Sequence, residues 1–227
     1  TEEEPVILKT LKDEYPLPQE ILRYRREYET TRNLNIDGIP QPLGLERINN
    51  RVVLITEDIG GQDLKYLLKS HTFTLHQLLT IAVEIARTLG KIHAANIIHA
   101  DLKTSNIIYN SETNRLQIID FGSSRAVAGA GSFGEFQGLV GTLLYISPEQ
   151  TGRINRPIDW RTDFYSLGVM LFELFTGRLP FETTDALELV HAHIARKPPR
   201  PDEINSEVPP GLSDVILKLL AKNPEAR

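Results

Sequence analysis

The stretch from His99 to Gly122 constrains the fold more than any other part of the sequence. Two apolar runs, Asn106–Tyr109 and Leu116–Ile119, flank the turn-forming residues 110–114. This pattern predicts a short β-hairpin, because two apolar strand-forming runs joined by polar turn residues pair readily.

Such a hairpin would bring three oxygen-bearing side chains, Asp101, Asn106 and Asp120, to one end of the structure, with Lys103 nearby. Taken alone, each of these residues could equally cap a turn or lie in a solvated loop. Oxygen ligands suit Mg²⁺, and a neighbouring ammonium group suits phosphate. The stretch therefore predicts a site for Mg²⁺ and phosphate.

Length and composition limit the class of protein. A chain of 227 residues can form one sizeable domain or two tightly packed lobes. The formal charge of −5 argues against a nucleic-acid partner, and no apolar run approaches the roughly 20 residues that span a bilayer. The chain has no cysteine, so we exclude disulfides and expect a reducing, cytoplasmic location.

The first quarter of the chain reads as a small sheet with one helix. Strands are predicted over residues 6–11, 43–48 and 51–56, because these runs are rich in apolar and β-branched side chains. The helix is predicted over residues 19–34, where apolar and aromatic side chains recur at loosely helical spacing.

After Gly60 the chain is predicted to be mostly helical. Thr74 and Gln77 form a capping-box pattern that opens a long helix to about residue 93. Residues 164–175 are apolar nearly all round, which predicts a buried helix ending at Gly177. We expect a proline-rich connector over residues 197–211. A last helix is expected to begin at Ser213.

The motif H-x-D-x-K-x-x-N followed by D-F-G resembles the eukaryotic-type Ser/Thr protein kinase domain. The resemblance implies an α+β, two-lobed fold that uses ATP and Mg²⁺. Residues 1–58 would form a small β-rich N-lobe with its first hairpin missing. Residues 59–227 would form a larger, mainly helical C-lobe that carries the catalytic loop and the activation segment.

The resemblance assigns roles in nucleotide binding. Lys9, in a strand resembling V-A-I-K, would contact the α- and β-phosphates of ATP, and Glu27 would be its ion-pair partner. Without the later motifs, both would read as solvated side chains. Thr56 would close the back of the nucleotide pocket, and the backbone from Glu57 to Ile59 would hydrogen-bond adenine.

The same resemblance assigns the catalytic roles. Asp101 would accept or orient the proton of the substrate hydroxyl, and Lys103 would neutralise the transferred phosphoryl group. Asn106 and Asp120 would hold Mg²⁺ between the phosphates. His99 is expected to be a structural residue beneath the catalytic loop.

Residues 141–149 resemble the end of an activation segment, with Ser-Pro-Glu in place of Ala-Pro-Glu. The resemblance implies that Thr142 hydrogen-bonds near the catalytic aspartate and that Glu149 pairs with Arg227. Asp163 would tie the buried helix to the backbone of the catalytic loop. Small-molecule phosphotransferases lack this block, which favours a protein substrate phosphorylated on Ser or Thr.

Two departures from the family pattern stand out. Ala100 replaces the arginine of H-R-D, which disfavours control by phosphorylation of the activation loop. Only five residues precede Val6, and a glycine-rich hairpin needs on the order of 15. We expect a truncated domain, cut before its first hairpin and after Arg227. Residues 129–134 match G-x-G-x-x-G but are interpreted as part of the activation segment.

Residues 151–166 and 180–191 resemble the N-terminal kinase domain of large bacterial, cyanobacterial-type signalling proteins. In those proteins an ATPase module, a GAF domain and a sensor histidine kinase follow in the same chain. The main alternative to an active protein kinase is a non-catalytic nucleotide-binding or scaffold pseudokinase domain. A small-molecule kinase is a third alternative, which the Ser147–Glu149 block disfavours.

Overall fold

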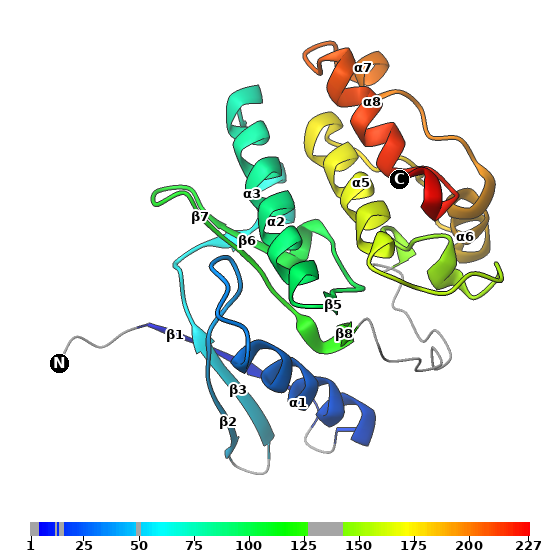
Figure 1. Ribbon diagram of the computed structural model, residues 1–227. Coiled ribbons are helices and arrows are strands. Elements are labelled where there is room, and N and C mark those ends of the chain that lie inside the picture. The colour runs from blue at the N-terminus through cyan, green and yellow to red at the C-terminus, as the bar shows by residue number, and fades with distance from the viewer. Residues whose placement is uncertain (1–4, 12, 14–15, 49–50, 127–142) are drawn as a thin grey trace.

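A computed structural model describes residues 5–11, 13, 16–48, 51–126 and 143–227. Figure 1 shows a three-stranded sheet with one helix along it at one end of the molecule, and a group of helices at the other end. The central hairpin lies between these two parts. The predicted α+β class is confirmed.

The first sheet has the strand order β1-β3-β2 and is antiparallel throughout. Its strands are β1 (Val6–Thr10), β2 (Pro42–Ile48) and β3 (Arg51–Glu57). Helix α1 (Pro18–Arg32) contacts β2 and β3. Pro18 occupies the first position of this helix, where its missing N–H costs no hydrogen bond.

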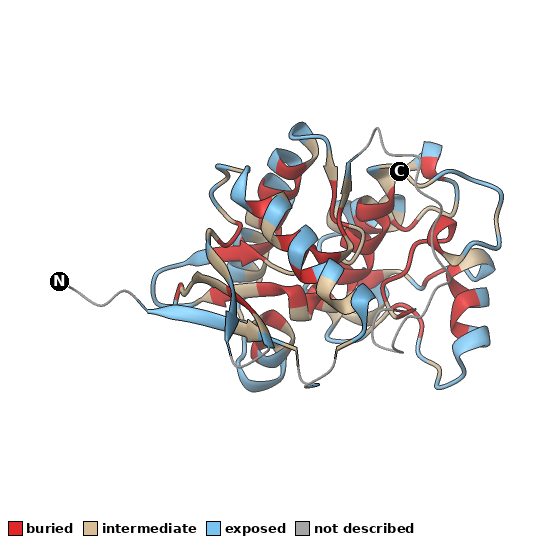
Figure 2. Cartoon of the chain, turned by 90° about the horizontal axis from the view of Figure 1, so that it is seen from below, coloured by how far each residue is buried: buried red, intermediate tan, exposed pale blue. Residues whose placement is uncertain are grey.

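Strand β1 is an edge strand of this sheet, and its apolar side chains are open to solvent. The exposed fractions are 43% for Val6, 47% for Ile7 and 58% for Leu8. Figure 2 shows this strand in pale blue, whereas buried residues gather in the interior of the helical part. Apolar residues on an open sheet edge form a surface that another segment can cover.

The central hairpin is present as predicted. Strands β6 (Ile107–Asn110) and β7 (Arg115–Ile118) pair antiparallel, with Ile107 opposite Ile118. Strand β4 (Gln62–Asp63) adds to the other edge of β6. The predicted strand began one residue too early, because Asn106 ends the 3₁₀ turn η1 (Thr104–Asn106) instead of joining β6.

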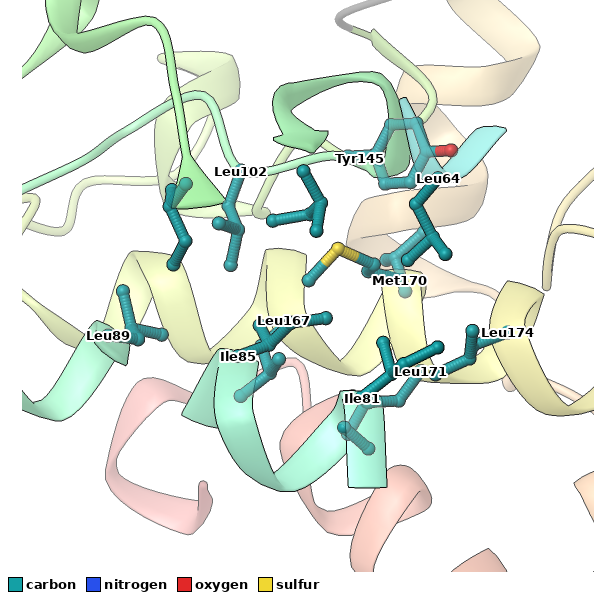
Figure 3. Packing of buried hydrophobic residues seen from close by; sticks show 14 of the residues in the cluster. Leu64, Ile81, Ile85, Leu89, Leu102, Tyr145, Leu167, Met170, Leu171 and Leu174 are labelled. Carbon is teal, nitrogen blue, oxygen red and sulfur yellow. The ribbon is translucent and has the colours of Figure 1, made fainter. Parts of the chain in front are cut away.

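The core lies mainly between two helices. Figure 3 shows Ile81, Ile85 and Leu89 of α3 facing Leu167, Met170 and Leu171 of α5, with Leu64, Leu102 and Tyr145 packed beside them. Helix α5 is buried on nearly every side, as its apolar sequence predicts, and Gly177 in the left-handed region (φ 71°) ends it. The helices of this part are α2 (Leu64–Ser70), α3 (Leu75–Ala94), α5 (Arg161–Thr176), α6 (Ala186–Ala195), α7 (Pro201–Ile204) and α8 (Pro210–Leu219).

Two predictions for the end of the chain were wrong. The expected connector contains the short helix α7, and the last helix α8 begins at Pro210, three residues before Ser213. Both helices have proline in their first turn, where the ring favours helical geometry. The two-residue strands β5 (Ile97–Ile98) and β8 (Arg125–Ala126) pair with each other and were not predicted.

Candidate active site

The side chain of Lys9 connects the first sheet, the first helix and the end of the central hairpin. Its Nζ lies 2.7 Å from Glu27 Oε2 on α1 and 3.1 Å from Asp120 Oδ1. Glu27 is only 6% exposed. Residues 111 positions apart in the sequence therefore share one charged cluster.

The pKa values in this cluster reflect burial and mutual attraction. Burial would lower the pKa of Lys9, but the carboxylates of Asp120 and Glu27 outweigh it and raise that pKa. Burial raises the pKa of Glu27, although Lys9 partly opposes this effect. Burial would also raise the pKa of Asp120, but the charge and hydrogen bond of Lys9 prevail and lower it.

The loop before the central hairpin gathers a second set of polar groups. Lys103 Nζ lies 2.7 Å from Asp101 Oδ2. Asn106 Nδ2 donates to the backbone oxygen of Asp101 at 2.8 Å and to its Oδ2 at 3.3 Å. The 3₁₀ turn η1 turns Asn106 back toward Asp101, so these three side chains converge.

His99 lies beneath this loop and is completely buried. Its Nε2 lies 3.0 Å from the carbonyl oxygen of Ile119, which can only accept, so this nitrogen carries the hydrogen. The backbone N–H of Asp101 donates to Nδ1 at 3.3 Å. The ring also contacts Phe121 edge-on, with 5.0 Å between ring centroids. Both ring nitrogens are thus engaged in structural contacts.

Asp120 adopts a left-handed backbone conformation (φ 70°) at the start of the 3₁₀ turn η2 (Phe121–Ser123). This conformation is uncommon for a residue with a side chain and is typical of functional sites. Phe121 is fully buried after it, and α1 packs on η2. The buried phenylalanine therefore fixes the point from which the Asp120 carboxylate projects.

The donor atoms at this site suit Mg²⁺ held together with phosphates. Because Asn106 Nδ2 is turned to Asp101, the Asn106 amide oxygen could serve as a ligand, and Asp120 could supply a carboxylate. Among the described residues, no group of three or more His, Cys, Asp or Glu side chains could hold a metal ion by itself. The donor set of Asn106 and Asp120 fits Mg²⁺, because this ion characteristically takes one or two carboxylates and completes its coordination shell with phosphate and water.

The residues expected at the adenine edge lie at the end of β3. Thr56 pairs with Ile7 of β1, and Glu57 pairs with Val6. The Glu57 side chain accepts a hydrogen bond from Gln117 Nε2 at 2.5 Å. Ile59 follows; it is 7% exposed and its carbonyl oxygen accepts from Asn110 Nδ2.

Asp163 of α5 holds the backbone that precedes Asp101. Its Oδ2 accepts from the N–H of His99 and its Oδ1 from the N–H of Ala100, both at 2.8 Å. His93 Nε2 lies 2.8 Å from the same Oδ2. His93 was not predicted from the sequence, because its partner Asp163 is 70 residues away and no local pattern points to His93.

Glu149 and Arg227 form a bidentate pair. Their side chains are 1% and 0% exposed, and Arg227 Nη2 lies 2.8 Å from Glu149 Oε2. Arg227 also donates to the backbone oxygen of Arg161 at the start of α5. Thr142 and the glycine-rich run at 129–134 lie outside the described residues.

Comparison with known proteins places this site in context. The protein kinase domain family matches residues 1–227. Serine/threonine-protein kinase PknB of Mycolicibacterium smegmatis is 33% identical over 218 residues, which are 92% of this chain and 34% of that protein. PknB of Mycobacterium leprae is 32% identical over 217 residues, with the same coverage of both chains.

A different kind of relative matches a shorter segment. The hybrid signal transduction histidine kinase G of Dictyostelium discoideum is 54% identical over 86 residues, which are 38% of this chain and 2% of that protein. The chain spans about a third of the length of the serine/threonine-protein kinases it matches. In the described part of the chain, no helix is long and apolar enough to cross a membrane. The match along the whole sequence shows that this chain belongs to the protein kinase family.

Proposed function

We propose that this chain is the catalytic domain of a serine/threonine-protein kinase that transfers the γ-phosphate of ATP to hydroxyl groups of a protein. The observation that carries the proposal is the double contact of Lys9 with Glu27 and Asp120. A lysine fixed between two carboxylates can hold phosphate oxygens at a defined place. Phosphoryl transfer needs mainly such positioning and charge neutralisation.

The remaining catalytic roles are proposed for the groups that converge in the loop before the central hairpin. Asp101 would orient the attacking hydroxyl and take its proton, and Lys103, at 2.7 Å from Asp101, would neutralise the transferred phosphoryl group. Asn106 and Asp120 would hold Mg²⁺. The ion, when bound, would neutralise charge on the phosphates. Thr56 and the backbone of Glu57 and Ile59 would line the adenine site.

The proposed arrangement has two parts. Residues 1–58 would form the nucleotide-binding lobe, and residues 59–227 would form the lobe that carries the catalytic loop. The exposed apolar side chains of β1 are a suitable surface for a preceding glycine-rich hairpin over the phosphates. Thr142, Glu149, Asp163 and Arg227 would position the activation segment and the protein substrate.

The test is phosphate transfer by the full-length protein with ATP, Mg²⁺ and a generic protein substrate. We expect phosphoserine or phosphothreonine in the hydrolysed product, and loss of the signal when Mg²⁺ is chelated. Nucleotide binding is measured in parallel by thermal shift. Binding of MgATP without any transfer would contradict the proposal and support the non-catalytic alternative.

We also propose that the domain works within a longer signalling protein that contains sensor, ATPase or histidine kinase domains. The 54% identity to a segment of a hybrid signal transduction histidine kinase supports this context. The proposal predicts a histidine kinase domain in the same polypeptide, which sequencing the complete gene would reveal. A complete reading frame without such a domain would overturn this part of the proposal.

A further inference from the structure

Ala100 holds an unfavourable backbone conformation next to the proposed base. Its φ is 64°, in the left-handed region, which is unfavourable for a residue with a side chain. Such a conformation persists only when surrounding contacts enforce it. The neighbouring peptide groups therefore need partners that hold them.

Two side chains from outside the loop hold this residue at both of its backbone polar groups. Asp163 Oδ1 accepts from the Ala100 N–H at 2.8 Å. Gln150 Nε2 donates to the Ala100 carbonyl oxygen, also at 2.8 Å. The Ala100 carbonyl belongs to the peptide that leads directly into Asp101, so Gln150 fixes the orientation of that peptide.

The amide of Gln150 can point in only one direction. Its Oε1 accepts from the backbone N–H of Ser147 at 3.0 Å and lies 3.1 Å from Ser147 Oγ. A backbone N–H can only donate and a carbonyl can only accept. A flipped amide would therefore lose both its backbone partners, and the Nε2 of Gln150 must face Ala100.

The support behind Gln150 is buried and extends to the Glu149–Arg227 pair. Ser147 is fully buried, and Gln150 is 7% exposed. Ser147 Oγ lies 2.8 Å from Thr162 Oγ1, which donates to Glu149 Oε1 at 2.9 Å. With the Ser147 hydroxyl donating to Thr162 and the Ser147 N–H donating to Gln150, hydrogen bonds on either side of Ser147 connect the start of α5 with the peptide before Asp101.

We propose that Gln150 is a positioning residue that couples the segment Ser147–Gln150 to the catalytic loop without any phosphate group. The amide maintains Ala100 in its left-handed conformation and thereby places Asp101. The inference rests on the proposed kinase function, because the group being placed is its base. In the family pattern, the arginine of H-R-D joins the activation segment to the catalytic loop through a phosphorylated residue. In this chain, the uncharged amide of Gln150 would join the two instead.

The test uses Gln150→Glu in the full-length protein, alone and combined with Ala100→Gly. Glutamate keeps the size of the side chain and an oxygen for Ser147, but it places a carboxylate oxygen against the Ala100 carbonyl. Glycine adopts a positive φ at little cost, so it needs less restraint. Gln19→Glu, on the exposed surface of α1, is the matched control for added charge.

Two quantities are measured for every variant. The first is the hydrogen exchange rate of the His99 and Ala100 amides, which donate to Asp163. The second is the pair of kinetic constants kcat and KM for ATP, each determined separately. For Gln150→Glu we expect faster exchange at both amides and a kcat lower by about 10²-fold, as for a misplaced catalytic group, with KM unchanged. Ala100→Gly should reverse most of both effects, and Gln19→Glu should show neither.

Unchanged exchange in Gln150→Glu would overturn the inference, and so would a loss that Ala100→Gly does not reverse. The latter result would show that Gln150 acts only through the stability of the fold. Should the wild-type protein transfer no phosphate, the proposed function fails, while the exchange measurement still decides whether Gln150 holds Ala100.

Discussion

Lys9 Nζ of β1 lies 2.7 Å from Glu27 Oε2 of α1, and this contact joins a solvent-exposed edge strand to a buried helical position. The Lys9 side chain is 35% exposed, whereas that of Glu27 is 7% exposed. The lysine is therefore reachable from solvent while its partner fixes it from behind. Such an arrangement suits a group that must contact a ligand in a set position.

Replacing Lys9 with methionine should reveal the cost of an unpaired Glu27. We expect Lys9→Met to lower the free energy of unfolding by about 1–2 kcal/mol, less than for a fully buried pair because solvent screens this lysine. Adding Glu27→Gln should recover part of that loss, since it removes the uncompensated charge. Urea unfolding of the wild type, the two single variants and the double variant measures the coupling energy between Lys9 and Glu27. Strictly additive effects of the two substitutions would contradict the prediction.

Arg227→Met should destabilise the protein far more than loss of an exposed ion pair. It leaves Glu149 charged and almost fully buried, at a cost of about 3–5 kcal/mol. The control is Arg156→Met, which breaks the exposed contact with Glu225 and should cost less than about 1 kcal/mol. Chemical denaturation compares the two, and similar losses would contradict the burial argument.

Lys222 should make stability rise with pH in the mildly alkaline range. Burial lowers the pKa of Lys222 to about 8, assisted by the nearby charge of Arg227, against an ordinary value of 10.5. Between these values the unfolded chain keeps a proton that the folded chain has lost, so unfolding takes up protons and becomes less favourable as pH rises. Unfolding of the wild type and Lys222→Met at pH 8.0, 9.0 and 10.0 measures the difference. Equal pH slopes in the two proteins would contradict it.

The same substitution at two glycines should have opposite effects. A Cβ at Gly61 would lie 2.9 Å from backbone atoms of Tyr109, so Gly61→Ala should cost about 1–3 kcal/mol through overpacking. A Cβ at Gly90, inside α3, would meet nothing within 4 Å, so Gly90→Ala should add about 0.5–1 kcal/mol to stability. Thermal unfolding of both variants measures the two effects. A more stable Gly61→Ala would contradict the packing around Gly61, and a less stable Gly90→Ala would contradict the prediction for α3.

The sequence predicted those elements whose causes are local. The capping box of Thr74 and Gln77 opens α3 as expected, and the apolar run of α5 is buried as expected. The hairpin of β6 and β7 followed from two apolar runs and a turn. By contrast, the prolines before α8 were assigned to a connector, although Pro210 begins the helix.

The hairpin and the family motifs point to the residues of the candidate site itself, but not to the residues that hold them in place. His93 and Gln150 reach Asp163 and Ala100, which are 70 and 50 residues away in the sequence. No periodicity or spacing marks such residues, because the packing of α3 and of the Ser147–Gln150 segment around the loop before the central hairpin decides which partners they contact. The left-handed backbone of Ala100 was equally absent from the sequence pattern, since alanine does not favour it.

The most direct test of the proposed kinase function is phosphate transfer by Asp101→Asn in the full-length protein. Asparagine keeps the size of the side chain but cannot take the proton of the attacking hydroxyl, so kcat should fall by about 10²–10⁴-fold. The KM for MgATP should stay near the wild-type value, because Lys9 and Asp120 are unchanged. Equal kcat values for the wild type and Asp101→Asn would contradict the assignment of this site as the active site of a protein kinase.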